Sequence, residues 1–163
     1  MTSDDLRALT ALGRRPDDEP LPRIQVRLID VDEQGRRLQP AALLWLGSLA
    51  LAMTPALKSR IEPVVRADGR FVELACDDGE FWMFVPQVRD VLDEARSHIV
   101  RFAEGNVMYV ERYAFKGAEI AEATAFRIPQ VPNGPMFCVR QLVEALASEQ
   151  GVRFAEVWRS GPD

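Results

Sequence analysis

Few residues of this chain have the types that nucleophilic or metal-dependent chemistry needs. His98 is the single histidine, and Cys76 and Cys138 are the two cysteines. A Ser-His-Asp or Cys-His site would have to use His98, which stands in no diagnostic motif. The chain has no C-x-x-C or H-x-x-x-H spacing and no glycine-rich phosphate loop. We therefore expect no catalytic, cofactor-binding or metal-binding residue, a structural role for His98, and buried free thiols at both cysteines.

Carboxylates are the remaining candidates for chemistry. The chain carries 25 acidic and 20 basic residues, a net charge of −5, and has an isoelectric point of about 5.0. No pair of acids stands out as the acid and base of an enzyme, so a carboxylate-pair enzyme is kept only as an alternative. A protein that binds nucleic acid usually carries a basic stripe, which is missing here. We therefore expect no nucleic-acid partner.

The acids gather in short clusters, which are Asp17-Asp18-Glu19, Asp77-Asp78 with Glu80, and Asp93-Glu94. Each cluster could be a solvated turn. Alternatively, the clusters could form an acidic face that steers a basic partner toward the protein.

The second cluster lies between two apolar runs, residues 71–76 and 81–85. Two such runs around a short turn with a glycine predict an antiparallel hairpin, in which Gly79 supplies a positive φ. Aromatic side chains point to both faces of the second run. Either both faces are covered, or one displays Trp82 as an interface anchor. The hairpin therefore provides the candidate partner interface: Asp77, Asp78, Glu80 and Trp82.

Two helices are indicated by their ends. Thr54 can accept free N–H groups of a first turn and Pro55 suits the first helical position, so a helix is predicted to begin there and end near Pro63. A second helix is predicted over 140–149, with Gly151 just past its last turn.

Strands are predicted from alternating or apolar runs at 24–28, 107–113, 125–128 and 152–157. Residues 41–53 could form a buried helix or two short strands split at Gly47-Ser48, and the second part favours strand.

The order of these elements predicts an α+β fold: a mostly antiparallel sheet with two or three short helices, in a single domain over 23–163. Residues 1–22 are expected to be an arm or linker, with weak helical spacing over 4–12 and poor packing over 14–22. Four apolar residues are expected to be buried together: Phe126, Leu142, Leu146 and Phe154.

The first residues are acidic and polar and do not look like a signal peptide. The most apolar stretch, 41–53, falls short of the ~20 residues that span a bilayer. We therefore expect a cytoplasmic protein with no membrane partner.

Several short segments after Thr54 follow one another in a familiar order. They are Leu57–Glu62, Val72–Leu74, Phe81–Val85, Val91–Ser97, Ala125–Arg127, Phe137–Leu146 and Gly151–Phe154. In this order the chain resembles the immunity proteins of bacterial polymorphic toxin systems, specifically the myxobacterial-type immunity family eleven. The helix after Phe137 usually opens with a serine in that family, where this chain has Arg140.

The resemblance implies a protein that binds and sterically neutralises a cognate toxin. An acidic inhibitor suits a basic target such as a nuclease, whose active site must attract phosphates. A non-catalytic adaptor, secretion chaperone or regulatory subunit is the alternative function, followed by the carboxylate-pair enzyme.

Overall fold

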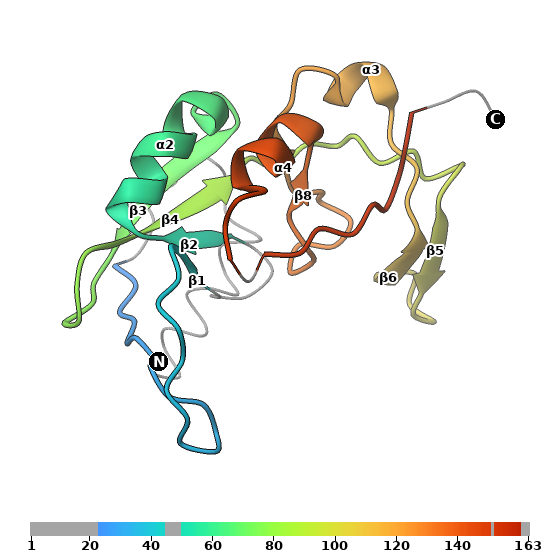
Figure 1. Cartoon of the computed structure of the whole chain (residues 1–163). Helices are drawn as coiled ribbons and strands as arrows, with labels where there is room; N and C mark the ends of the chain where they lie inside the picture. Colours follow the sequence, from blue (N-terminus) through green and yellow to red (C-terminus); the bar gives the residue numbers. More distant parts are fainter. Residues whose placement is uncertain (1–22, 45–49, 151, 161–163) are drawn as a thin grey trace.

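A computed structural model describes residues 23–44, 50–150 and 152–160. The predicted arm at 1–22, with its segments 4–12 and 14–22, lies outside the described residues. Within them the chain forms three helices and eight strands (Figure 1), which confirms the predicted α+β fold. The helices are α2 (Pro55–Val65), α3 (Gly117–Ile120) and α4 (Arg140–Leu146). The strands are β1 (Leu43–Leu44), β2 (Leu51–Met53), β3 (Gly69–Leu74), β4 (Phe81–Pro86), β5 (His98–Arg101), β6 (Val107–Arg112), β7 (Ala125–Phe126) and β8 (Phe137–Cys138).

The largest sheet has four strands in the order β1-β2-β4-β3, and all its pairs are antiparallel. β3 and β4 form the predicted hairpin, with Phe71 opposite Phe84 and Leu74 opposite Phe81. The segment 41–53, for which the sequence allows a buried helix or two short strands, contains the two short strands β1 and β2. β2 lies in the second part of the segment, where the sequence favours a strand. β4 therefore lies in the middle of the sheet, and this explains why its apolar residues alternate toward two covered faces.

Each face of β4 contributes to a different part of the core. Phe81, Met83 and Val85 pack with Ile24 and Leu74 on one face. On the other face, Phe84 packs in a second cluster with residues of α2 and α4. This double cover agrees with the interpretation of the aromatic residues as core.

Helix α2 begins as the sequence predicts. Thr54 is the N-cap, and its side-chain oxygen accepts a hydrogen bond from the Leu57 N–H at 3.5 Å. Leu57, Ile61 and Val65 repeat every fourth residue, and all three are buried. This spacing places them on one face of the helix, which packs toward the sheet and α4.

The predicted end of this helix near Pro63 is wrong, because α2 continues to Val65. A proline inside a helix removes one N–H donor and costs stability. Here Pro63 is exposed, and the next turn brings Val65 into the core, where its burial offsets part of that cost. The Arg66 N–H then donates to the Glu62 carbonyl at 3.0 Å and closes the last turn.

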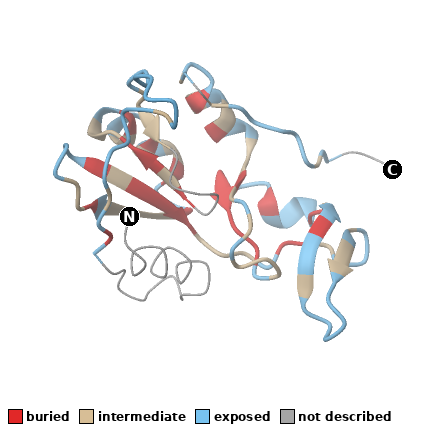
Figure 2. Ribbon diagram, turned by 90° about the horizontal axis from the view of Figure 1, so that it is seen from below, coloured by how far each residue is buried: buried red, intermediate tan, exposed pale blue. Residues whose placement is uncertain are grey.

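The remaining strands form two separate two-stranded sheets, β5-β6 and β7-β8, rather than extending one sheet. β6 matches the predicted strand at 107–113 to within a residue, whereas β5 was not predicted. Figure 2 shows that the β5-β6 hairpin is mostly exposed, while buried residues lie on the four-stranded sheet, on the helices and around β7 and β8. A third apolar cluster lies beside these small sheets and is built around Phe115, Phe126 and Phe137.

The predicted strand at 24–28 is also wrong. Only Gln25 makes a β-bridge, with Ala75, through hydrogen bonds on either side of it. Ile24 is fully buried, but Leu28 and Ile29 are 39% and 66% exposed. The alternation of apolar and polar residues continues to Leu28, but no apolar partner among the described residues covers that side chain. The chain therefore leaves the sheet.

The C-terminal segment departs from prediction in the same way. α4 ends at Leu146 instead of Glu149, and residues 152–157 form no strand. Leu142 and Leu146 are buried, but in a different cluster from Phe126, and Phe154 is 40% exposed. The expectation that these four residues pack together is therefore wrong. Trp158 packs instead against the third apolar cluster, which contains Phe126. Its indole lies edge-on to the ring of Phe115, with the ring centroids 5.7 Å apart.

A buried carboxylate joins the start of the β3-β4 hairpin to residues that come later in the chain. Asp68 is 2% exposed, and its Oδ2 accepts hydrogen bonds from the Thr124 N–H at 2.8 Å and hydroxyl at 2.6 Å. Its Oδ1 accepts from Arg89 Nη2 at 2.5 Å. Nearby, the buried Arg127 side chain donates from Nε to the Pro86 carbonyl at 3.0 Å. These bonds hold the β3-β4 hairpin against the residues on either side of β7.

Candidate functional site

The predicted acidic turn connects β3 to β4 and projects from one end of the sheet (Figure 1). Asp77, Asp78, Gly79 and Glu80 are all exposed. Gly79 has a positive φ of +154°, as expected for the glycine of this turn. The turn is therefore reachable by a partner and is held by a rigid hairpin.

Two of the three carboxylates in the turn already have partners within the molecule. Asp78 Oδ2 accepts a hydrogen bond from the Leu28 N–H at 3.2 Å and lies 3.8 Å from Cys76 Sγ. Glu80 Oε1 accepts from the Trp82 indole N–H at 3.0 Å. A carboxylate has about four acceptor positions, so both groups keep capacity for a further donor. Asp78 nevertheless has a structural task, since it holds the 24–28 segment against the turn.

Asp77 differs from its neighbours, because its side chain has no hydrogen bond or ion pair with any described residue. It lies at a shallow cleft of about 410 Å³ formed by the end of β3, the turn and the start of the described chain. The charged residues of this cleft are Arg23, Glu73, Asp77 and Glu80. Three carboxylates against one guanidinium make its rim acidic, so it attracts cationic groups.

Sequence reasoning missed Glu73 and Arg23 as residues of this site. Glu73 belongs to β3 and is exposed. Arg23 comes near it because the bridge between Gln25 and Ala75 aligns the start of the described chain with the end of the hairpin. The only signal in the sequence was strand alternation, which placed Glu73 on the opposite face from the half-buried Val72 and the buried Leu74 but could not indicate a cleft.

The fourth candidate, Trp82, lies outside this cleft. It is half-buried on the face of β4 that α2 covers. The ammonium group of Lys58 on α2 stands over the indole ring, 4.3 Å from its centroid, in a cation–π contact. Lys58 Nζ also pairs with Glu62 at 3.2 Å. Trp82 thus contacts the site through Glu80 and does not stand out as a free anchor.

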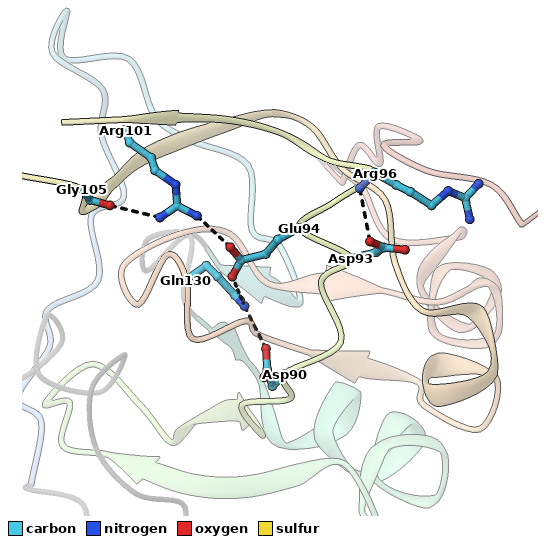
Figure 3. Close-up of polar contacts among 7 residues, drawn as sticks. All are labelled: Asp90, Asp93, Glu94, Arg96, Arg101, Gly105 and Gln130. Atoms are coloured by element: carbon cyan, nitrogen blue, oxygen red, sulfur yellow. Dashed lines mark hydrogen bonds and ion pairs between the residues drawn. The ribbon is translucent and has the colours of Figure 1, made fainter. Parts of the chain in front are cut away.

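The other described acidic cluster, at 93–94, is mostly engaged within the fold (Figure 3). Asp93 Oδ1 accepts from the Arg96 N–H at 3.2 Å, and Glu94 pairs with Arg101 Nη2 at 2.7 Å. Gln130 Nε2 bridges Asp90 Oδ1 at 2.8 Å and Glu94 Oε1 at 3.1 Å. Two of these contacts are local, and Gln130 joins the loop to a segment 36 and 40 residues further along the chain, so this cluster organises a loop.

The residues first considered for nucleophilic chemistry lie apart. Cys76 and Cys138 are both free, as expected, but half-buried rather than buried. Burial raises the pKa of the Cys138 thiol to about 12, which keeps it protonated and unreactive near neutral pH. His98 is exposed on β5, with Nδ1 2.6 Å from a carboxylate oxygen of Glu111. This arrangement is an ordinary surface contact.

Within residues 23–44, 50–150 and 152–160, no three His, Cys, Asp or Glu side chains are grouped so that they could hold a metal ion. In the same ranges, no helix has the length and apolar character to cross a bilayer. No protein-family model matches the chain, and no curated protein matches it either.

Proposed function

We propose that this protein is a cytoplasmic immunity protein that binds and sterically neutralises a cognate bacterial toxin, with the acidic turn and its cleft at the interface. The observation that carries the interface is the Asp77 carboxylate, which has no partner among the described residues and lies at the rim of an exposed acidic cleft. The ordered resemblance after Thr54 supports the choice of an immunity protein.

The physical argument for this partner is electrostatic. Glu73, Asp77 and Glu80 face the same cleft and outnumber its single arginine. Such a rim raises the local concentration of a basic surface and speeds encounter. A toxin that acts on nucleic acid carries such a basic surface around its active site, and a protein seated there blocks substrate entry.

Co-expression with the protein encoded directly upstream tests the function. The expected result is that cells survive the toxin only when this chain is present, and that the two proteins co-purify. Absence of both protection and complex would overturn the proposal. A stable complex with a non-toxic protein would favour the adaptor alternative instead.

The interface is tested separately, by Asp77→Asn and Glu73→Gln. Neither side chain has a partner in the described residues, so both variants should fold normally. We expect each to slow association by about twofold or more at low ionic strength and to weaken its salt dependence. Glu104→Gln is the matched control, because Glu104 is an exposed acid in the turn between β5 and β6. Equal association rates for test and control variants would remove the turn from the interface.

Asp78 is unsuitable for this test. Its carboxylate holds the Leu28 N–H, so a change in binding after its replacement could come from a displaced 24–28 segment.

A further inference from the structure

The side of β3 that faces away from β4, which we call the outer edge, is open along most of the strand. β3 is the last strand of the four-stranded sheet. Among the described residues, only the segment around Gln25 pairs with this edge, through its bridge to Ala75 just past the end of β3. Residues 69–73 are all at least partly exposed. The edge of a sheet presents backbone N–H and C=O groups to which a further strand can bond.

The register of the hairpin decides which of these backbone groups point outward. Residues that face each other in an antiparallel pair are hydrogen-bonded to one another at every second position. The Gln87 N–H donates to the Asp68 carbonyl at 2.7 Å, so Asp68, directly before β3, is a bonded position. Counting in twos from Asp68 directs the N–H and C=O of Val72 toward β4. The same count directs those of Phe71 and Glu73 toward the outer edge.

The backbone of Ala75 agrees with this count. Its N–H donates outward to the Ile24 carbonyl at 3.0 Å, and its carbonyl accepts from the Val26 N–H at 2.9 Å. This contact does not extend to the next outward positions. The outward groups of Phe71 and Glu73 have no hydrogen-bond partner in the part of the chain that the structure describes. The edge therefore offers two donors and two acceptors, which one short added strand can satisfy.

The charges beside the outer edge select what can pair with it. The end of β3 forms one wall of the acidic cleft, where Glu73, Asp77 and Glu80 outnumber Arg23. A second copy of this chain, paired through the same edge, would bring two sets of these acids together, and like charges across paired strands are destabilising. A basic strand would instead place its Lys or Arg side chains beside the carboxylates, which attract them.

We propose that an extended basic segment of the toxin adds to the outer edge of β3 as a further strand. Its backbone bonds to Phe71 and Glu73, and one of its Lys or Arg side chains lies in the acidic cleft. Strand addition takes affinity from main-chain hydrogen bonds and specificity from side-chain sites at alternate positions. The added strand ends before Ala75, because Ile24 and Val26 occupy the edge there. This inference deepens the proposed function and rests on it.

Amide hydrogen exchange, followed residue by residue by NMR, tests the proposal in the chain alone and in its complex with the protein encoded directly upstream. In the chain alone, the Phe71 and Glu73 amides are expected to exchange at least about tenfold faster than the Val72 amide, which is bonded to β4. In the complex, the two outward amides are expected to slow by at least about tenfold, while Val72 stays slow in both states.

The possible failures of this experiment are distinguishable. Outward amides that are already slow in the chain alone, or that keep their rates in the complex, would overturn the strand addition and leave the immunity function standing. Absence of any complex would overturn both proposals.

A pair of variants at Glu73 separates the backbone from the charge. Glu73→Pro removes the outward N–H but no bond to β4, and an exposed edge position tolerates proline. Glu73→Gln is its match, because it removes the same charge and keeps the N–H. The proline variant is expected to bind about fivefold more weakly than the glutamine variant, since it loses one main-chain hydrogen bond. Equal affinities of the two variants, both folded by circular dichroism, would contradict the strand addition; if the proline variant does not fold, the exchange rates decide.

Discussion

Asp68 provides the sharpest test of how the β3-β4 hairpin is joined to the residues around β7. Its side chain is 3% exposed and ends in three hydrogen bonds, two from Thr124 and one from Arg89. The variant Asp68→Ala removes the acceptor of all three. It leaves the N–H and hydroxyl of Thr124 buried without a partner, and Arg89 without its carboxylate.

The expected cost follows from these contacts. Each buried donor left unsatisfied costs about 1–3 kcal/mol. Arg89 adds less than a fully buried partner, because its side chain is 30% exposed and water can replace part of the contact. Together the losses amount to about 3–5 kcal/mol, the range seen when one partner of a buried ion pair is removed. For a protein of this size, such a loss lowers Tm by about 10 °C.

Urea and thermal unfolding followed by circular dichroism measure the effect, with Asp30→Ala as a control at an exposed acid. A loss below about 1 kcal/mol for Asp68→Ala would refute the reasoning. If the alanine variant does not fold, a double-mutant cycle with Asp68→Asn and Thr124→Val replaces it. The cycle should give a coupling energy of at least about 1 kcal/mol, and additive effects would contradict the contact.

Two further predictions concern packing and pH. Gly69→Ala should lower the free energy of unfolding by about 2–3 kcal/mol, because the new Cβ would overlap the Val85 carbonyl oxygen and lie 2.7 Å from ring atoms of Phe84. Urea titration measures this loss. Unchanged stability would show that β3 and β4 are not so close at Gly69. The second concerns Cys138, whose thiol has a pKa of about 12 in the fold and about 8.5 in the unfolded chain. Because the folded pKa is the higher one, the contribution of this thiol to stability is complete below about pH 8.5 and is lost as the pH rises toward 12. By pH 10 this loss is at most about 2 kcal/mol, and unfolding curves at several alkaline pH values should show a smaller loss for Cys138→Ala; the same alkaline loss in both proteins would contradict the assignment.

Local signals in the sequence were enough to predict the elements that depend on a few adjacent residues. Thr54-Pro55 begins a helix in both the prediction and the structure, because capping and a proline at the first helical position act within one turn. The β3-β4 hairpin and its acidic turn follow from two apolar runs around Gly79. For the same reason, Asp77, Asp78 and Glu80 could be placed together at an exposed site.

The members of the site that lie far apart in the chain could not be predicted. Glu73 and Arg23 share the acidic cleft only because the chain at Gln25 forms a bridge with Ala75. Trp82 projects from the strand as its alternation predicts, but only the packing of α2 decides that Lys58 stands over its ring.

The same distinction explains the wrong predictions. Alternation at 24–28 and 152–157 is real, but a strand also needs a neighbour with free backbone groups and an apolar face to cover. Among the described residues of these two segments, such a neighbour is present only at Gln25. Near the C-terminus the side chain that packs on the core is Trp158, whereas Phe154 was the residue predicted to do so. Periodicity therefore determined which side chains could share a face, whereas tertiary packing decided which faces were covered, because burial depends on partners that are distant in the chain.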